Sequence, residues 1–524
     1  MAKLTIDGKE ITARDGATII EAAHEAGLVI PHYCYHPKLS IAGNCRMCLV
    51  ELEGRPKLEI SCNTPVANDM VVHTNSPRVI EGRRGVLEFL LINHPLDCPI
   101  CDQAGECGLQ DYYMHYGMYR SRFQEEKVHK RKVVDFGPDV VYDAERCILC
   151  TRCVRFCEEI TKTNELEVFY RGDTAEIATF PGKRLDNPYA GNTVDICPVG
   201  ALTSKDFRFK IRVWFLRETT SICPGCARGC NINIHHHDGH VYRLKPRRND
   251  AVNETWMCDE GRFGYKAINA ATRLLHPHMR RGDTLVQATW QDALQCVTSV
   301  MQQYGGDAVG VIVRPQGTNE DAYLLAKLSV DILRTSHVIL HTGEPGYEDT
   351  LLLCADKNPN TRGAQDMGLP APATSERLAD LQQAIEHGTV KVIYAIDTDL
   401  TAVFGPEVAS RLATQLECVI IQASHMLPGA AQAHVVLPST TYAERDGTFT
   451  NVQGRIQRIN PAIRRLGEAW PAWQIYTRLA QALGQEWSYT SAEAVLADIA
   501  TTMTHYHGLS YAKIGDLGSP VSQG

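Results

Sequence analysis

The chain has 524 residues, of which 44% are hydrophobic and 22% charged, the balance of an ordinary globular protein. Its formal net charge of −8 does not suggest a nucleic-acid-binding chain, and no uninterrupted apolar run is long enough to span a membrane. The chain length leads us to expect three or more domains. The first residues lack the apolar core of a secretory signal, so we expect the chain to stay in the compartment where it is made.

The N-terminal part predicts strands around one helix. Two short strands, over 3–6 and 10–12, flank Asp7-Gly8, which is a hairpin signal, and a helix over 17–26 ends at Gly27. Ser76-Pro77 predicts the start of another helix that runs to about residue 93. Its expected buried face carries Val79, Val86, Phe89 and Leu90. The charged segment 120–132 is interpreted as a solvated linker.

Beyond about residue 271 the pattern alternates between helix and strand. Helices are predicted over 290–304, 375–387 and 406–417, and strands over 308–313, 337–340, 390–396 and 418–422. Thr318 and Asp321 predict a further helix that opens with a capping box. This alternation predicts a mostly parallel sheet with helices on both faces.

The chain contains 19 cysteines, and only Cys296, Cys354 and Cys418 lie beyond Cys258. Because no export signal is evident, a disulfide framework is not expected. The first group, C-x10-C-x2-C-x13-C, follows the loop, pair and distant ligand of plant-type [2Fe–2S] ferredoxins, although its first gap is longer. The preceding hairpin and helix suit a β-grasp domain. Zinc remains the alternative. The group consists of Cys34, Cys45, Cys48 and Cys62.

The second group has three cysteines, Cys98, Cys101 and Cys107, and His94 precedes them by four residues. Three thiolates leave one iron of a four-iron cluster without a protein ligand, and His94 can complete the set. A neutral imidazole in place of a thiolate should raise the reduction potential, as histidines do in Rieske centres. Weaker candidates for the fourth ligand are Asp97, Asp102 and Glu106.

The third group, C-x2-C-x2-C-x3-C, is the first half of a bacterial two-cluster ferredoxin, completed by a remote Cys-Pro. Asn187, Ala190 and Thr193 stand where a second cluster would need cysteines, so one [4Fe–4S] cluster is predicted and Cys157 is left free. The predicted ligands are Cys147, Cys150, Cys153 and Cys197. Three interleaved arginines either offset cluster charge or form a solvated face: Arg146, Arg152 and Arg155.

The fourth group, C-x2-C-x3-C-x27-C, also favours a [4Fe–4S] cluster over zinc. It consists of Cys223, Cys226, Cys230 and Cys258. Strands over 232–234 and 241–244 flank the histidine-rich stretch 235–240, which we interpret as a solvated turn rather than a metal site. Four cysteines stay outside the four groups and are expected to be buried packing residues: Cys157, Cys296, Cys354 and Cys418.

Several motifs together resemble the family of large iron–sulfur subunits of respiratory complex I, the NADH–quinone oxidoreductase. They are Asn44-Cys-Arg-Met-Cys-Leu-Val, His94-Pro-Leu-Asp-Cys-Pro-Ile-Cys-Asp-Gln-Ala-Gly-Glu-Cys, Arg146-Cys-Ile-Leu-Cys-Thr-Arg-Cys-Val-Arg-Phe-Cys and Cys258-Asp-Glu-Gly-Arg-Phe-Gly-Tyr. The resemblance is close over residues 1–270 and looser beyond. It implies one [2Fe–2S] cluster in the first group and [4Fe–4S] clusters in the other three.

The second half resembles molybdopterin oxidoreductases of the formate dehydrogenase type through Val435-Val-Leu-Pro and Glu444-Arg-Asp-Gly-Thr-Phe-Thr-Asn. Catalytic members have a cysteine or selenocysteine in the region corresponding to 336–345, where this chain has none. Formate dehydrogenases also have a lysine near the position of Glu260. The resemblance therefore implies a shortened scaffold without molybdopterin.

The resemblance implies a multidomain α/β and α+β chain. Its expected parts are a β-grasp [2Fe–2S] ferredoxin domain (1–78), a helical His–Cys₃ segment (79–119), a bacterial-ferredoxin-like [4Fe–4S] domain (138–215), a [4Fe–4S] subdomain of the molybdenum-enzyme type (216–272) and the molybdopterin-oxidoreductase-like α/β domain (273–524).

As an implied function, the chain relays electrons in an NADH:quinone oxidoreductase, without an NADH or quinone site or any catalytic residue of its own. No dinucleotide or P-loop motif is present. The implied partners are a flavin-containing, NADH-oxidising subunit, a two-cluster ferredoxin-like subunit and other peripheral-arm subunits. The implied location is peripheral, on the cytoplasmic side of the inner (plasma) membrane. Two alternatives stay open: an electron-transfer subunit of an NAD-linked hydrogenase or formate dehydrogenase, and a zinc-stabilised scaffold that binds partners.

Overall fold

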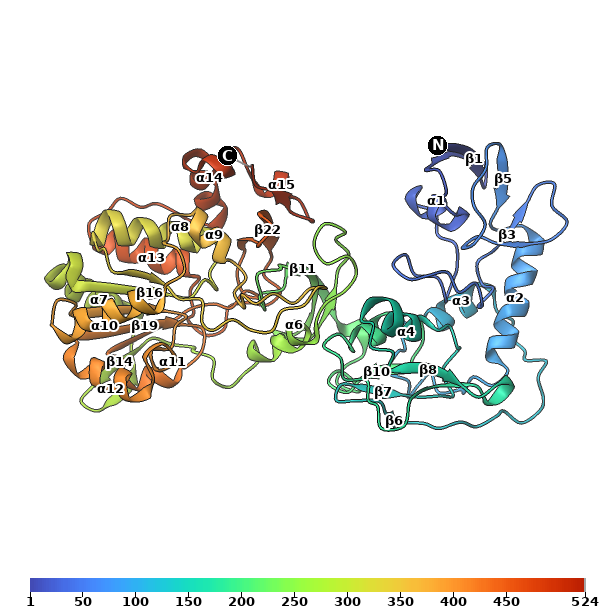
Figure 1. The fold of residues 1–524 in the computed structure, drawn as a ribbon, viewed down its shortest axis with the longest axis horizontal. Coiled ribbons are helices and arrows are strands. Elements are labelled where there is room, and N and C mark those ends of the chain that lie inside the picture. Colours follow the sequence, from blue (N-terminus) through green and yellow to red (C-terminus); the bar gives the residue numbers. More distant parts are fainter. Residues whose placement is uncertain (523–524) are drawn as a thin grey trace. The chain divides into compact units, whose positions relative to one another are not determined.

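The structure, a computed structural model, describes residues 1–522. The chain forms two compact units, Met1–Leu216 (unit 1) and the part from Arg217 onward (unit 2), as Figure 1 shows by colour. Within residues 1–522, no helix has both the length and the apolar character needed to cross a membrane.

Unit 1 begins with a five-stranded sheet. Its strands are β1 (Ala2–Ile6), β2 (Lys9–Ala13), β3 (Leu49–Leu52), β4 (Glu59–Ile60) and β5 (Met70–His73), in the order β2-β1-β5-β3-β4, and helix α1 (Ile19–Glu25) shares their apolar core. The β1–β2 hairpin is confirmed. Its turn residues, Asp7 and Gly8, have φ values of 49° and 81°, the backbone conformation that a two-residue hairpin turn requires.

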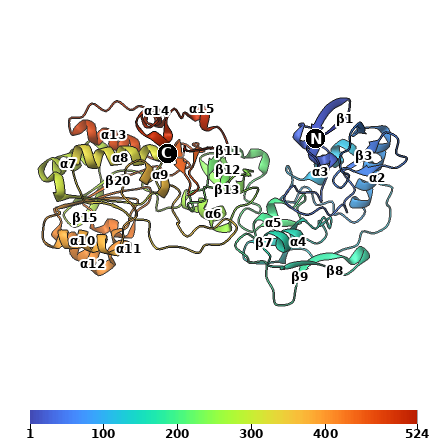
Figure 2. The ribbon, with the colours of Figure 1, turned by 45° about the horizontal axis from the view of Figure 1, so that its top comes forward.

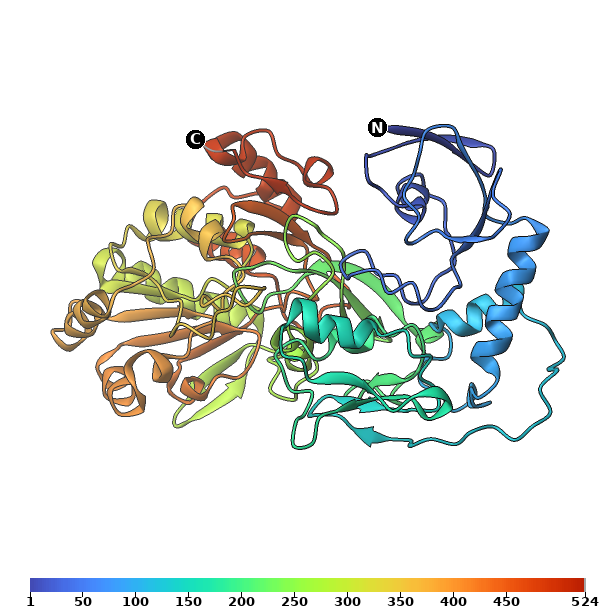
Figure 3. The ribbon, with the colours of Figure 1, turned by 45° about the vertical axis from the view of Figure 1, so that its right-hand side comes forward.

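Helix α2 (Pro77–Leu91) begins as predicted, with the Ser76 hydroxyl accepting a hydrogen bond from the Val79 N–H at 3.3 Å. The predicted buried face is wrong at Phe89, which is 78% exposed. Val79 is buried as predicted, and the other buried residues of the helix are Arg83 and Leu87. Arg83 can be buried because its guanidinium donates to the Leu49 carbonyl (2.9 Å) and to a tyrosine hydroxyl of α3 (Gly108–Tyr116). Figure 3 shows α2 and α3 side by side.

The rest of unit 1 consists of short elements that leave long loops for the cysteine groups. Strands β6 (Val134–Asp135), β7 (Val140–Tyr142) and β10 (Leu202–Ser204) form one small sheet, and β8 (Leu166–Phe169) pairs with β9 (Glu176–Thr179). Helix α4 (Arg152–Arg155) continues into a π-helical turn, Phe156–Ile160, and α5 (Asn192–Asp195) precedes Cys197. Residues 120–132 contain no helix or strand, which agrees with the predicted linker.

Unit 2 opens with the three-stranded sheet β11 (Arg217–Ile222), β12 (Asn231–His237) and β13 (His240–Pro246), followed by α6 (Asp259–Phe263). The interpretation of the histidine-rich stretch as a solvated turn is wrong for His235 and His236, which are buried within β12. Only Asp238 and Gly239 form the turn. His235 lies 3.1 Å from a Glu218 carboxylate oxygen on the neighbouring strand, so a cross-strand partner allows its burial.

The large sheet of unit 2 confirms the predicted parallel architecture. Five parallel strands are β16 (Val309–Val313), β17 (Val338–Leu340), β18 (Val392–Ile396), β19 (Cys418–Ala423) and β20 (Val435–Pro438), and the hairpin β14 (His278–Arg281)–β15 (Thr284–Gln287) extends the sheet antiparallel. The order is β15-β14-β20-β19-β18-β16-β17. Runs such as Val309–Val313 are buried throughout because helices cover both faces.

Two helix layers cover this sheet, as Figure 2 shows. One layer contains α7 (Trp290–Tyr304), α8 (Asn319–Lys327), α13 (Ala472–Ala482) and α14 (Ala492–Thr502), and the other contains α10 (Ser375–Glu386) and α12 (Pro406–Gln415). The remaining elements are α9 (Thr361–Asp366), α11 (Leu400–Phe404), α15 (Tyr511–Ile514) and the sheet of β21 (Gly447–Thr450), β22 (Arg455–Ile459) and β23 (Ser519–Pro520). The capping box of Thr318 and Asp321 is present.

Candidate metal centres

Site 1 comprises the cysteines of the first group, which the structure arranges as two pairs. Cys34 is a close neighbour of Cys45, and Cys48 of Cys62. The Cys34 N–H also donates to the Cys45 sulfur at 3.4 Å. The donor set thus fits a cluster of two irons, each needing two thiolates, better than it fits a single ion.

Site 3 is a cavity in unit 1 lined by the four predicted cysteines, Cys147, Cys150, Cys153 and Cys197. Three come from the loop before α4 and from α4 itself, and Cys197 comes from the loop after α5. Cys157 does not line this cavity. It is fully buried in the π-helical turn, where its carbonyl accepts the N–H groups of Thr163 and Asn164.

Site 2 is a second cavity of unit 1, and His94 lines it together with Cys98, Cys101 and Cys107. Burial lowers the pKa of His94 to about 4, and the nearby Arg146 and Lys127 cations lower it further. The imidazole is therefore neutral at pH 7 and has a lone pair available for a metal. Asp97 also lines the cavity, but ion pairs with Arg146 (2.9 Å) and Lys132 (2.5 Å) engage its carboxylate. Asp102 and Glu106 do not line it.

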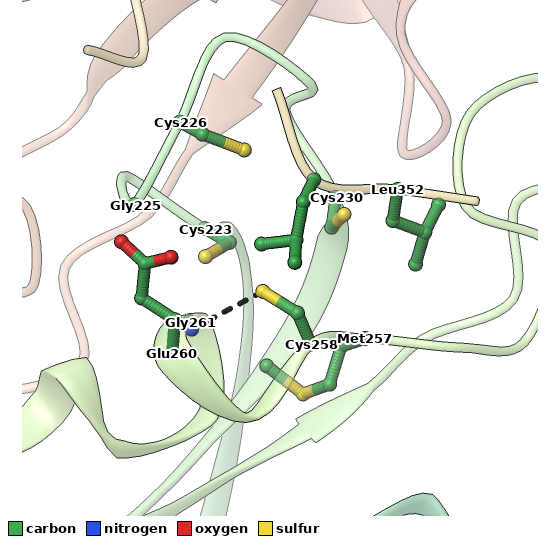
Figure 4. Close-up of a pocket in the computed structure, with 10 residues that line it drawn as sticks. Cys223, Gly225, Cys226, Cys230, Met257, Cys258, Glu260, Gly261 and Leu352 are labelled. Carbon is green, nitrogen blue, oxygen red and sulfur yellow. Dashed lines mark hydrogen bonds between the residues drawn. The ribbon is translucent and has the colours of Figure 1, made fainter. Parts of the chain in front are cut away.

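Site 4 lies in unit 2, between the β11–β12 loop and the start of α6. Figure 4 shows its four predicted cysteines around one pocket, with Leu352 from a distant segment on the same wall. The lining includes all of Cys223, Cys226, Cys230 and Cys258. The Cys258 sulfur accepts the Gly261 N–H at 3.3 Å. Such hydrogen bonds help to set the potential of a bound cluster.

Glycines leave no side-chain room beside the cysteines. A Cβ atom on Gly200 would lie 2.3 Å from the Cys101 sulfur in site 2, and one on Gly261 would lie 2.8 Å from the Cys223 sulfur in site 4. Sequence reasoning missed both glycines, although each follows a predicted ligand by three residues. Within residues 1–522, no three His, Cys, Asp or Glu side chains converge as ligands of one ion would.

Buried arginines join site 1 to site 3. The Arg155 guanidinium donates to the carbonyls of Cys34 (2.6 Å), Cys150 (3.2 Å) and Ser40. Arg152 lines the site 3 cavity and donates to the Tyr35 carbonyl, next to Cys34. The alternative of a solvated face is therefore wrong for Arg155, and also for Arg146, since both are buried.

One loop joins site 3 to site 2. Cys197 and Val199 line site 3, and Gly200 lines site 2. The carbonyl of Pro198 accepts the Gly108 N–H at 3.0 Å, directly after the site 2 cysteine Cys107. Arg146 adds a second link, because its side chain lines site 2 while the next residue, Cys147, lines site 3. The loop from Cys197 to Gly200 and the adjacent residues Arg146 and Cys147 therefore connect the walls of the two cavities.

Burial governs the protonation of the thiols. It raises the pKa of Cys147, Cys150 and Cys197 to about 11 each, so these groups are neutral thiols at pH 7 in the absence of metal. Because iron binds thiolates, loading of the site must release protons. The cationic Arg152 close to Cys150 and Cys197 then offsets part of the negative charge.

Two contacts at site 4 could not be anticipated from spacing. Cys354, expected to be an isolated packing residue, contacts Cys226. Glu260, which stands where formate dehydrogenases have a lysine, pairs with Lys357 at 2.8 Å. Both partners come from one loop, with Lys357 lying 97 residues after Glu260 and Cys354 lying 128 residues after Cys226, and no local sequence signal marks them.

Family models match along most of the chain. The matches are 2Fe-2S iron-sulfur cluster binding domain (residues 1–77), NADH-ubiquinone oxidoreductase-G iron-sulfur binding region (83–122), NADH-quinone oxidoreductase subunit 3, ferredoxin-like domain (137–203), Molybdopterin oxidoreductase Fe4S4 domain (216–270) and Molybdopterin oxidoreductase (357–482). Together with the four cysteine sites, these matches define the class of the chain as an iron–sulfur protein.

Similar proteins identify the family within that class. The NADH-quinone oxidoreductase G subunit of Rickettsia bellii is 32% identical over 593 residues, covering 92% of this chain and 86% of that protein. The mitochondrial NADH-ubiquinone oxidoreductase 78 kDa subunit of Candida albicans is 31% identical, covering 99% and 87%. The chain therefore belongs to the G-subunit family of NADH-quinone oxidoreductases, the iron–sulfur relay subunits of complex I.

Other alignments are shorter. The corresponding G subunit of Rickettsia conorii is 44% identical over 330 residues, but the match covers 63% of this chain and only 49% of that protein. A solved structure, an NAD+-reducing [NiFe]-hydrogenase in the H2-reduced state, is 34% identical and covers 40% of this chain and 91% of the matched chain, with a TM-score of 0.37. That TM-score is too low to establish a common fold.

Proposed function

We propose that this chain relays single electrons within an NADH:quinone oxidoreductase, from a flavin-containing partner to a ferredoxin-like partner. The observation that carries the proposal is the direct linkage of three cysteine sites within unit 1. Arg155 bonds to backbone carbonyls of both site 1 and site 3, and the loop from Cys197 to Gly200 belongs to both site 3 and site 2. The resemblance to the family implies the order site 1, site 3, site 2, and these contacts support it.

The proposed ligands are the residues predicted from spacing. Site 1 would hold a [2Fe–2S] cluster and sites 2, 3 and 4 one [4Fe–4S] cluster each. When bound, these clusters supply one-electron carriers whose potentials depend on ligand type, charge and hydrogen bonding. The protein would keep each cluster shielded from water. In site 3, for example, all four cysteines are buried or half-buried, and Arg152 lines the same cavity. His94 supplies a neutral ligand in site 2.

Site 2 is the proposed exit of the relay. Cys98 is the one exposed member among the sixteen proposed ligands in residues 1–522, and its neighbours Leu96 and Ile100 are 89% and 64% exposed. An acceptor protein can therefore approach this edge closely. Site 4 lies in unit 2, and the resemblance to the family implies that its cluster stands off the main path of the relay.

Unit 2 is proposed to bind no molybdopterin. The segment 336–345, which contains β17, has no cysteine, and Glu260 is engaged by Lys357. We further propose that the chain acts as a peripheral subunit on the cytoplasmic side of the inner membrane. Its proposed neighbours also include other subunits of the peripheral arm.

The test is metal analysis combined with electron paramagnetic resonance (EPR) during graded reduction of the full chain, purified without oxygen. The proposal expects about 14 irons per chain, little zinc and no molybdenum or nickel. Stoichiometric zinc with little iron would favour a structural scaffold and refute the relay. Molybdenum or nickel in the same sample would favour a subunit of a formate dehydrogenase or a hydrogenase.

A further inference from the structure

A fifth thiol lies beside site 4 without lining the pocket itself. Cys354 is buried and packs in one cluster with Cys226 and Ala227, and its S–H donates a hydrogen bond to the Leu352 carbonyl at 3.8 Å. Cys354 therefore packs in the same cluster as a proposed ligand of site 4.

The segment that carries Cys354 is part of the wall of site 4. Leu352 and Leu353 line the pocket together with the four cysteines (Figure 4). Arg228 donates to the Leu352 carbonyl at 3.2 Å, and the Ala227 N–H donates to the Asp356 carbonyl at 2.9 Å. These two bonds, one on either side of Cys354 in the sequence, hold its backbone against the loop that carries Cys226.

Thiol contact at a cluster ligand has a chemical consequence. A buried cysteine that touches a ligand sulfur can reach the same iron after a displacement of about one atomic diameter, if that ligand is withdrawn. The exchange breaks one iron–sulfur bond and forms another, and the proton of the incoming thiol passes to the departing thiolate. No electron is gained or lost, so the exchange requires no oxidant or reductant.

We propose that Cys354 is a reserve ligand of site 4, able to bind the iron that Cys226 binds. This inference rests on the proposed [4Fe–4S] cluster in site 4. While Cys226 is the ligand, Cys354 stays off the iron and donates its hydrogen bond to the Leu352 carbonyl. When Cys226 is lost, Cys354 replaces it. Cys223 and Cys258 have no such reserve, because Cys354 contacts Cys226 in particular.

Iron content per chain and the EPR signals of the full chain test the proposal. Cys226→Ala should keep the iron content of the unmodified protein, with a shifted signal from the fourth cluster. Cys226→Ala/Cys354→Ala should lose about four irons. The matched control Cys226→Ala/Cys418→Ala removes a buried thiol of β19 instead and should keep the iron. The clusters of unit 1 serve as internal references for folding.

Two results would overturn the proposal. Cys226→Ala and the Cys226→Ala/Cys354→Ala variant could lose the same amount of iron, or both could retain all of it; in either case Cys354 is no reserve ligand. Cys223→Ala separates this failure from failure of the cluster assignment. It should lose about four irons, and full retention in both Cys223→Ala and Cys258→Ala would refute the cluster in site 4 itself.

Discussion

Replacing Gly200 by alanine should remove the cluster of site 2 while leaving the fold of unit 1 intact. The added Cβ would lie 2.3 Å from the Cys101 sulfur and 3.0 Å from the Gln103 Cβ, whereas ordinary contact begins at 3.4 Å. The sulfur must therefore move by about 1.1 Å. Metal–ligand distances tolerate deviations of only about 0.2 Å, so Cys101 could no longer bind iron. Gly200 does not have a positive φ, so backbone strain does not contribute.

The assay is iron content and graded reduction of the Gly200→Ala chain. We expect a loss of about four irons and the disappearance of one EPR signal, with the clusters of sites 1 and 3 still reducible. Gly108→Ala is the matched control. It lies next to the site 2 cysteine Cys107, but its added Cβ would come no closer than 3.4 Å to any atom. Full iron content and an unchanged site 2 signal in Gly200→Ala would refute the steric argument.

Three further predictions concern single side chains. His94→Ala should block electron transfer beyond site 3 while sites 1 and 3 stay reducible in a rapid-reduction experiment; unchanged throughput would exclude His94 as a ligand. Arg155→Met should lower the unfolding free energy by about 3 kcal/mol, because it leaves buried carbonyls unsatisfied. The control Arg122→Met removes an exposed ion pair with Glu88 and should lower the unfolding free energy by less than about 1 kcal/mol in the same denaturation assay. Equal losses of unfolding free energy in the two variants would contradict this reasoning. Burial raises the pKa of Glu320 to about 7, so its protonated form favours the fold. Stability should fall by about 3 kcal/mol as the pH rises from about 4.5 to 7, and Glu320→Gln should abolish this fall in thermal unfolding measured across that range.

The sequence by itself determined the local elements and which residues make up the candidate metal sites. Cysteine spacing specified Cys147, Cys150 and Cys153 because loop and first-turn geometry bring residues three apart to one side of a cavity. Ser76-Pro77 marked the start of a helix because a capping hydroxyl and a fixed φ act within one turn. The alternating segments after residue 271 predicted a parallel sheet because burial on both faces requires continuous apolar runs.

Only the tertiary structure decided how these parts meet. The burial of Arg155 depends on carbonyls up to 121 residues away in the sequence. The need for glycine at position 200 arises from the sulfur of Cys101, and the packing of Cys354 against the Cys226 loop joins segments far apart in the sequence. The helical periodicity predicts that Phe89 lies on the buried face of α2. The pattern cannot show that Arg83 has hydrogen-bond partners in the interior and is buried in the same helix instead. Such contacts join segments that share no local sequence pattern, so hydrophobic periodicity and cysteine spacing cannot reveal them. They arise only when the chain packs into its tertiary structure.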